Sequence, residues 1–173
     1  RAMMLQPAVV VADEPTSALD VSIQAQILNL FMDLQEATAT AYVFISHNLA
    51  VVEHVAHEVM VMYFGSAVEQ GPKAEVFRRP QHPYTWGLLT SMPRLDRLKQ
   101  DRLLPIAGNP PSLINLPPGC AFHPRCAFRE FAPCACDEVV PDLLESYPKH
   151  DSRCHIPVAK RADLFANVIA PRL

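Results

Sequence analysis

The chain has 173 residues, the size of one ordinary domain or of two small ones. Half of its residues are hydrophobic and 19% are charged, which excludes a disordered polyelectrolyte and is typical of a globular protein. With a formal net charge of -3 and a pI of about 6.2, it offers no broad basic surface, so we expect no nucleic-acid partner.

The longest apolar runs, residues 7–12 and 59–64, are far shorter than the roughly 20 residues that a membrane-spanning helix needs, so we expect a soluble protein. The chain begins at Arg1 without an initiator Met or a signal sequence, and we expect it to be a fragment of a longer protein. All five cysteines lie between Cys120 and Cys154. An odd, clustered count without an export signal favours metal ligation in a reducing cytoplasm over disulfides.

Residues 8–12 form a short, β-branched apolar run that predicts a buried parallel strand ending at Asp13. After a loop over residues 15–20, apolar side chains recur at helical spacing, and Asp20 and Ser22 offer capping oxygens for a helix. The apolar residues of this predicted amphipathic helix are Ile23, Ile27, Leu30, Phe31 and Leu34.

Residues 42–45 predict a second strand, residues 49–58 a helix, and residues 59–63 a third strand. The resulting order of strands and helices, β-α-β-α-β, predicts parallel strands joined by right-handed crossovers.

The composition changes at Gly71-Pro72, after which prolines are dense as far as Pro148. Regular structure must be short there, and we expect a loop-rich accessory region. The tail over residues 156–173 carries one weakly amphipathic stretch, residues 162–169.

Asp13 and Glu14 fall at the carboxyl end of the first predicted strand, where open α/β sheets bind their ligands. Asp13 could hold a magnesium ion, because that cation prefers oxygen ligands, and Glu14 could polarise an attacking water. Taken alone, the pair is also compatible with a strand that simply ends in solvated acids.

Residues 13–20, Asp-Glu-Pro-Thr-Ser-Ala-Leu-Asp, resemble the Walker B segment and D-loop of ABC ATPases. His47 stands after the next strand, where that family places its switch histidine. The resemblance implies a magnesium-holding Asp13, a catalytic Glu14, and a His47 that contacts the γ-phosphate of ATP. It also assigns Ser17 and Asp20 to the D-loop, the loop that meets the opposite ATPase subunit at the nucleotide.

No Gly-x-x-x-x-Gly-Lys-Ser/Thr phosphate loop and no Leu-Ser-Gly-Gly-Gln signature occur in the chain. In ABC ATPases both precede Walker B, so the resemblance implies a C-terminal fragment that does not hydrolyse ATP unaided. Its sheet would have an exposed edge, and we expect the isolated piece to be poorly stable.

Three further segments resemble the C-terminal extension of oligopeptide and dipeptide importer ATPases, and the whole match runs from Arg1 to about His155. They are residues 81–89, 104–113 and 116–126. Members of that family bind an iron-sulfur cluster in this extension through four cysteines, although four thiolates suit a 4Fe-4S cluster and a tetrahedral zinc ion equally well. The candidate ligands are Cys120, Cys126, Cys136 and Cys154.

The third cysteine comes later in this chain than in the family's usual spacing, so Cys134 competes with Cys136 for that place. Counting back from Pro141 and Leu143 favours Cys136. Unmetallated cysteines are the alternative, but a region so poor in regular structure needs a staple.

We expect His82, His123 and His150 to be structural or solvent-facing, while His155 is a ligand candidate worth testing. The aromatic residues Tyr84 and Trp86 are expected to pack the extension onto the ATPase core.

The expected fold is α/β: residues 1–72 as the C-terminal half of a RecA-like ABC ATPase core, and residues 73–173 as a cysteine-bearing extension. The resemblance implies an ATP-hydrolysing subunit of an ABC importer that uses ATP and Mg²⁺ to power dipeptide or oligopeptide uptake. It would lie at the cytoplasmic face of the bacterial inner membrane. Its partners would be a second ABC ATPase subunit, like or unlike itself, transmembrane permease subunits and, indirectly, a peptide-binding protein.

Two other functions fit parts of the sequence. One is a non-transport ABC ATPase with zinc modules that acts on damaged DNA, which would need basic grooves and C-x2-C ligand pairs, and the sequence has neither. The other is a stand-alone iron-sulfur or zinc module with a vestigial ATPase part. The cargo, whether dipeptide, longer peptide, nickel or another solute, is left open because other subunits choose it.

Overall fold

The computed structural model describes residues 2–92, 105–112, 114–132 and 136–173. The chain forms two compact units, residues 1–56 (the N-terminal unit) and residues 57–173 (the C-terminal unit). Each unit combines helices with a sheet, in agreement with the expected α/β class. The assignment of residues 1–72 and 73–173 to two functional domains stays a prediction.

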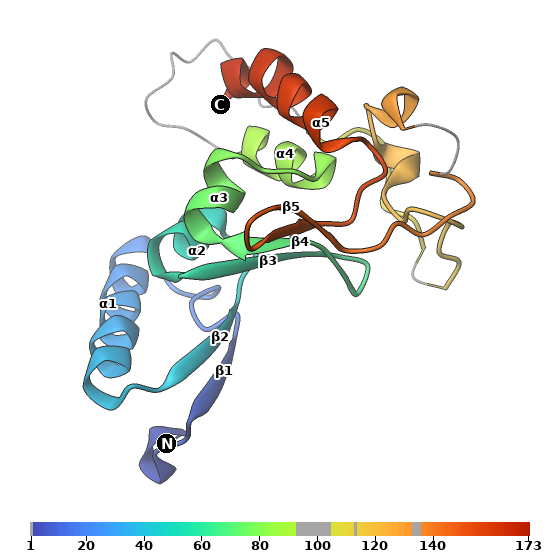
Figure 1. Ribbon diagram of the computed structural model, residues 1–173. Coiled ribbons are helices and arrows are strands. Elements are labelled where there is room, and N and C mark those ends of the chain that lie inside the picture. The colour runs from blue at the N-terminus through green and yellow to red at the C-terminus, as the bar shows by residue number, and fades with distance from the viewer. Residues whose placement is uncertain (1, 93–104, 113, 133–135) are drawn as a thin grey trace. The chain divides into compact units, whose positions relative to one another are not determined.

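The N-terminal unit is built around two parallel strands joined by a long helix (Figure 1). Its elements are a 3-10 helix, Ala2–Leu5, then β1 (Val9–Asp13), α1 (Val21–Thr38), β2 (Ala41–Ile45) and α2 (Leu49–Val55).

Helix α1 has defined caps at both ends and packs on one face of the strand pair. The Asp20 side chain caps its first turn, and Ala39, in the left-handed region at φ 52°, closes its last. The ring of Phe31 meets Tyr42 and Phe44 of β2 edge-on, with ring centres 5.3 and 5.8 Å apart. These contacts fix the helix over the face of the sheet that carries the aromatic residues.

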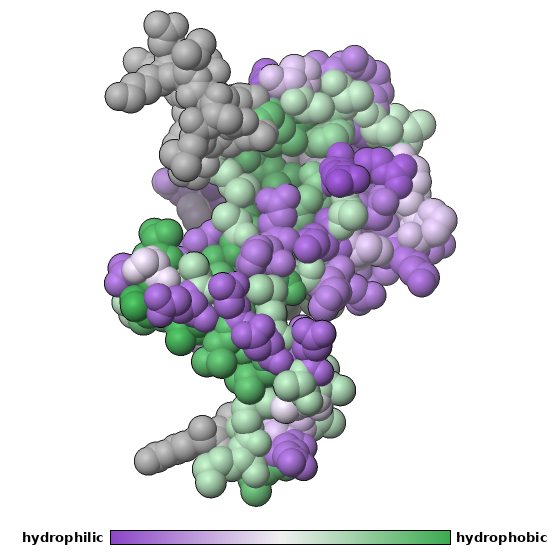
Figure 2. Space-filling model, turned by 90° about the vertical axis from the view of Figure 1, so that its left-hand side faces the viewer, coloured by the Kyte–Doolittle hydropathy of each residue, from purple (hydrophilic) through white to green (hydrophobic). Residues whose placement is uncertain are grey.

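The opposite face of the same strand pair is apolar and exposed. Val11 is 65% exposed and Val43 50% exposed, because one helix covers only one face of the two strands. The prediction of a buried first strand is therefore right for alternate residues only. Hydrophobic residues are visible at the molecular surface among the hydrophilic ones (Figure 2). Those exposed on this sheet are Val9, Val11, Val43 and Ile45.

The C-terminal unit contains an antiparallel sheet of four strands in the order β3-β4-β6-β5, and α4 and α5 lie on the same side of it (Figure 1). The strands are β3 (Glu58–Tyr63), β4 (Ser66–Pro72), β5 (Leu144–Tyr147) and β6 (His150–Ser152). The helices are α3 (Lys73–Arg78), α4 (Pro83–Thr90) and α5 (Val158–Leu164), followed by a π-helical turn, Phe165–Ile169, and a 3-10 turn, Ala170–Arg172.

The prediction that the third strand adds in parallel to the first two is wrong. Strand β3 instead pairs with β4 in an antiparallel hairpin. The chain reverses at Phe64 and Gly65, whose φ angles are 47° and 74°. Two consecutive positive φ angles make the tight turn that matches strand twist, a turn usually signalled by Asn-Gly or Gly-Gly. Because phenylalanine occupies the first turn position, the sequence lacks that signal.

The core of the C-terminal unit forms where α4 and the C-terminal helix meet. Trp86 is 1% exposed, its Nε1 donates to the Pro80 carbonyl at 2.8 Å, and its ring meets Phe128 edge-on at 5.2 Å. The prediction that Trp86 packs the extension onto the ATPase core is wrong, because the cluster that Trp86 joins lies within residues 73–173. The other buried members of the cluster are Ala132, Ile156, Leu164 and Ile169.

The region expected to be loop-rich has little regular structure in its described part. Between α4 and β5 the described residues form only two 3-10 turns, His123–Arg125 and Arg129–Phe131. In the described residues of both units, no helix is long and apolar enough to cross a membrane.

Candidate functional site

The parallel pairing of β1 and β2 brings their carboxyl ends to one edge. Asp13 lies opposite Ile45, and the Glu14 backbone N–H donates to the Ile45 carbonyl at 2.9 Å. His47 follows two residues after that carbonyl, and its Nδ1 lies 2.8 Å from Oε1 of Glu14. The two side chains predicted to act together are therefore in hydrogen-bond contact, across 33 positions of sequence.

Glu14 has a backbone conformation that side chains other than glycine rarely adopt. Its φ is 44°, in the left-handed region, which costs about 1 kcal/mol or more. The Glu14 carbonyl accepts from the Ser17 backbone N–H at 3.2 Å and from the Ser17 hydroxyl at 3.0 Å. This tight turn ends the strand abruptly and holds the exposed Glu14 carboxylate at the sheet edge.

The Asp13 carboxylate is exposed at the end of β1 and makes no hydrogen bond or ion pair with other described residues. It adjoins Glu14 in sequence but is not part of the contact with His47. An exposed carboxylate without a partner keeps its oxygens available to a hard cation such as Mg²⁺.

Asp20 starts α1, as predicted, and its carboxylate accepts hydrogen bonds from the first turn. One oxygen, Oδ1, accepts from the backbone N–H groups of Ser22 and Ile23, both at 3.0 Å, and from the Ser22 hydroxyl at 2.7 Å. The N–H of Ile23 is the main cause of the lowered pKa of Asp20, followed by the Ser22 hydroxyl. Ser22 therefore lies in the first turn and bonds to the cap residue instead of capping the helix itself.

This edge groups one free carboxylate, Asp13, with a carboxylate-imidazole pair, Glu14 and His47, while Ser17 and Asp20 shape the adjoining loop. A neutral imidazole that donates from Nδ1 carries a lone pair on Nε2. To donate toward a phosphate from Nε2, His47 must carry a second proton or release Glu14. The arrangement suits chemistry in which the carboxylate changes partner when an anionic ligand arrives.

The second candidate site is the group of cysteines in the C-terminal unit. Four are described and all are free thiols, whereas Cys134 lies outside the described residues. The backbone N–H of Cys120 donates to the Cys136 carbonyl at 2.9 Å, which ties together two of the predicted ligand segments. The four described cysteines are Cys120, Cys126, Cys136 and Cys154.

Hydrogen bonds from the backbone oppose the rise in pKa at three of these cysteines, in each case including one from the residue two positions further along the chain. Such hydrogen bonds favour the thiolate over the thiol, and N–H bonds to sulfur are also a means by which proteins tune iron-sulfur clusters. The pairs are Cys120 with Phe122, Cys126 with Phe128, and Cys154 with Ile156.

The charges of the cysteines affect one another's pKa. The pKa of Cys126 is raised to about 12, mainly by burial and in smaller part by the charges of the other three described cysteines. The pKa of Cys154 is likewise raised to about 11, mainly by burial, with Cys120 and Cys136 as minor causes. Four thiols therefore share one neighbourhood. Yet no group of three or more Cys, His, Asp or Glu side chains within the described residues has an arrangement that could hold a metal ion.

Sequence comparisons find relatives of this chain in one family. A family profile described as "Oligopeptide/dipeptide transporter, C-terminal region" matches residues 68–134. The chain is 56% identical over 134 residues to the dipeptide transport ATP-binding protein DppF of Escherichia coli, covering 78% of this chain and 40% of that protein. This chain belongs to the family of peptide-transport ATP-binding proteins.

Two further relatives extend the match within this family. The di/tripeptide transport ATP-binding protein DppF of Pseudomonas aeruginosa is 56% identical over 143 residues, 83% of this chain and 43% of its own length. A probable peptide ABC transporter ATP-binding protein, y4tS of Sinorhizobium fredii, is 47% identical over 174 residues, 99% of this chain and 46% of its own length. The chain thus spans less than half the length of each of these relatives.

The histidines of the extension have protein partners. Nδ1 of His123 lies 2.9 Å from the Cys120 carbonyl, and Nε2 of His155 lies 2.8 Å from the Val139 carbonyl. His82 is 1% exposed and accepts the Tyr84 backbone N–H at the start of α4. Burial, and after it the charge of Arg161, lowers the pKa of His82 to about 3, so this imidazole is neutral.

The C-terminal unit also contains a buried carboxylate that the sequence does not single out. The Glu69 side chain is fully buried and its two oxygens accept four hydrogen bonds. Oε1 accepts from the Gln81 backbone at 2.5 Å and contacts Nε2 of His150 at 2.7 Å, and Oε2 accepts from the His82 backbone at 3.0 Å and the Thr85 hydroxyl at 2.5 Å. The only signal in the sequence is that Glu69 is the one acidic residue of β4, a strand that also carries Ser66 and Gln70.

Proposed function

We propose that the complete protein is an ATP-binding and ATP-hydrolysing subunit of an ABC importer that powers uptake of dipeptides or oligopeptides. The observation that carries the proposal is the 2.8 Å contact of Glu14 with His47 at the shared carboxyl edge of β1 and β2, in a chain of this family. Relatives named for peptide transport favour a peptide cargo, and nothing favours the DNA-directed or stand-alone alternatives.

In this proposal Asp13 holds Mg²⁺, which neutralises phosphate charge, and Glu14 orients the attacking water. His47 donates a hydrogen bond to the terminal phosphate as charge develops there. The Glu14–His47 contact keeps both groups at the edge before nucleotide arrives, and the tight turn at Ser17 sets the direction of the loop toward Asp20. The phosphate cradle and the signature would come from parts of the protein outside these 173 residues.

The partners in this proposal are a second ABC ATPase subunit, whose D-loop side meets residues 17–20, the permease subunits, and indirectly a peptide-binding protein. The protein would work at the cytoplasmic face of the bacterial inner membrane. Residues 1–72 would serve the nucleotide and residues 73–173 would form the transporter-specific extension.

We further propose that Cys120, Cys126, Cys136 and Cys154 hold a 4Fe-4S cluster or a zinc ion. The donor set fits, because four free thiols share one neighbourhood and three already accept N–H bonds. A bound cation would favour the thiolates that burial otherwise disfavours, and closing the group would need adjustment of its loops. The metal would staple a region of little regular structure.

The test is ATP turnover of the complete protein, reconstituted in vesicles with its permease subunits. We expect turnover to rise when a peptide-loaded binding protein is added, with no response to DNA. Zinc-loaded protein stimulated by DNA, or a metal-loaded protein without any turnover, would support one of the two alternatives and remove the importer proposal.

A further inference from the structure

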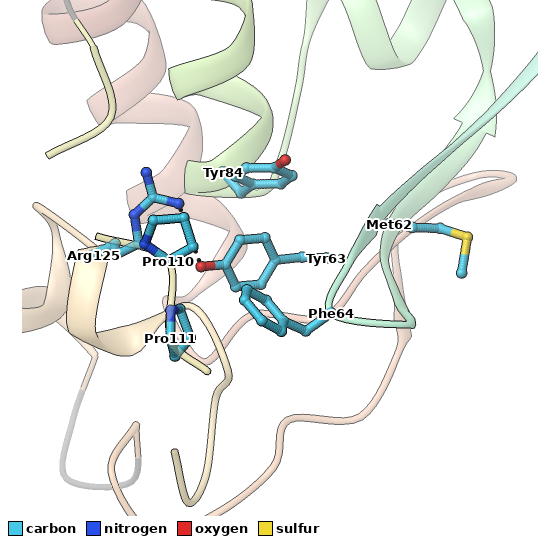
Figure 3. A pocket seen from close by; sticks show the side chains of 7 residues that line it. All are labelled: Met62, Tyr63, Phe64, Tyr84, Pro110, Pro111 and Arg125. Atoms are coloured by element: carbon cyan, nitrogen blue, oxygen red, sulfur yellow. Dashed lines mark hydrogen bonds between the residues drawn. The ribbon is translucent and has the colours of Figure 1, made fainter. Parts of the chain in front are cut away.

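The C-terminal unit contains a pocket of about 580 Å³ beside the turn between β3 and β4 (Figure 3). This volume lies within the range of small-molecule sites. Aromatic and proline side chains form most of its wall, and among the described residues that line it one arginine is the only charged one. The residues that line it include Tyr63, Phe64, Tyr84, Pro110, Pro111 and Arg125.

Three rings form a continuous aromatic wall. The Tyr63 ring lies 4.7 Å from that of Phe64 and 4.7 Å from that of Tyr84, between the two (Figure 3). Tyr63 is 5% exposed, while Phe64 and Tyr84 are half-buried and keep part of their surface open. The wall can therefore receive a flat apolar group against the rings of Phe64 and Tyr84.

Phe64 occupies a backbone position that its side chain does not favour. Its φ of 47° belongs to the left-handed region, and Asn or Gly would make the same hairpin turn with less strain. Phenylalanine there costs on the order of 1 kcal/mol. The turn therefore does not explain why an aromatic ring stands at this position, whereas the contribution of the ring to the pocket wall does.

Arg125 supplies a fixed charge at the pocket. Its Nε donates to the Ala107 carbonyl at 3.2 Å, Nη2 donates to the Ile106 carbonyl at 3.2 Å, and Nη1 to the Tyr63 hydroxyl at 3.5 Å. A guanidinium has five N–H donors, so one on each terminal nitrogen is left over by these bonds. Within the described residues Arg125 pairs with no carboxylate, and its charge is uncompensated there.

We propose that this pocket binds a small carboxylate that carries an aromatic ring. The carboxylate takes the two remaining donors of Arg125, and the ring packs on Phe64 and Tyr84. A free aromatic acid and the C-terminal residue of a peptide present this same chemistry. The site does not depend on the ATPase proposal, since none of its residues belongs to the N-terminal unit.

The experiment is calorimetric titration of the complete protein with N-acetyl-phenylalanine, with the tripeptide Ala-Ala-Phe, and with the amide of each. We expect saturable binding of at least one acid and at least about tenfold weaker binding of its amide, because a charge-assisted bond is lost. Binding of the tripeptide alone identifies a peptide C-terminus as the ligand, and binding of both acids identifies the shared group. Equal affinity for acid and amide, or saturation by neither acid, overturns the proposal.

Two variants test the contributions of the aromatic wall and of the arginine charge to binding separately. Phe64→Gly removes the ring and relieves the turn, so it should fold normally and bind the acid about tenfold more weakly. Its control, Phe64→Tyr, keeps the ring and should bind as the parent protein does. Arg125→Gln should reduce acid binding to the level of the amide, with circular dichroism confirming the fold. Unchanged affinity in Phe64→Gly contradicts the proposal even if Arg125→Gln fails to fold.

Discussion

Nδ1 of His47 and Oε1 of Glu14 are 2.8 Å apart, and both side chains are largely open to solvent, with 74% and 47% of their surfaces exposed. An exposed pair of this kind contributes little to stability. Its position at the common carboxyl edge of two parallel strands gives it a functional reading instead, since that edge is where such sheets bind ligands.

The Glu14–His47 contact predicts that the two residues act as one unit in ATP turnover. In the complete protein, His47→Ala should lower turnover about a hundredfold. In the double variant with Glu14→Gln, the fold loss of turnover should be much smaller than the product of the fold losses of the two single variants. The reason is that the effects of groups that act together are not additive. Turnover measured for both single variants and the double variant tests this. Strictly multiplicative losses would mean that the contact has no part in catalysis.

The buried Glu69 carboxylate predicts a large loss of stability on neutral substitution. Glu69→Gln replaces an acceptor by a donor that faces other donors, and should lower the free energy of unfolding by about 3 kcal/mol. Urea unfolding of the 173-residue chain, followed by the fluorescence of its single tryptophan, reports on this unit. The matched change of an exposed acid, Glu138→Gln, should have little effect. Equal effects of the two variants would contradict this account of Glu69.

His82 predicts a pH dependence of stability. Its pKa is about 3 when folded, against an ordinary 6.5, so between these values the unfolded chain binds more protons than the folded one. Stability should therefore fall as pH is lowered from about 6.5 toward about 3, by at most about 1.4 kcal/mol per pH unit from this residue. His82→Asn keeps a capping acceptor for Tyr84 but cannot titrate. Urea unfolding at several pH values should show a shallower slope for this variant, and identical slopes would refute the assignment.

The cysteine group predicts which thiols bind metal. Complete protein purified without oxygen should contain iron or zinc, and iron in a 4Fe-4S cluster would add a visible absorption band. Cys126→Ser and Cys136→Ser should lose the metal, while Cys134→Ser should keep it. Metal analysis of the three variants decides this. If Cys134→Ser lost the metal and Cys136→Ser kept it, the assignment of the third ligand would be reversed.

Much of the N-terminal unit was predictable because its signals are local. The apolar run before Asp13 and the capping Asp20 mark a strand and a helix start without any knowledge of distant residues. The contact of Glu14 with His47 also followed, since parallel pairing places the ends of successive strands together.

The rest depended on long-range contacts or on local exceptions. The β3-β4 hairpin was missed because Phe64 stands where Asn or Gly is usual. The role of Glu69 depends on His150, which is 81 positions away and joins it only through the antiparallel sheet. The grouping of Cys154 with Cys126 likewise comes from tertiary packing, and spacing alone identified the candidates without placing them.

The most direct test of the ATPase assignment is the Glu14→Gln change in the complete protein, measured as ATP hydrolysis and, separately, as ATP binding. The account predicts that hydrolysis falls by a hundredfold or more, roughly the contribution of a positioned base, while ATP still binds. The control Glu36→Gln, an exposed acid on α1, should hydrolyse ATP normally. Undiminished hydrolysis in Glu14→Gln would contradict the account.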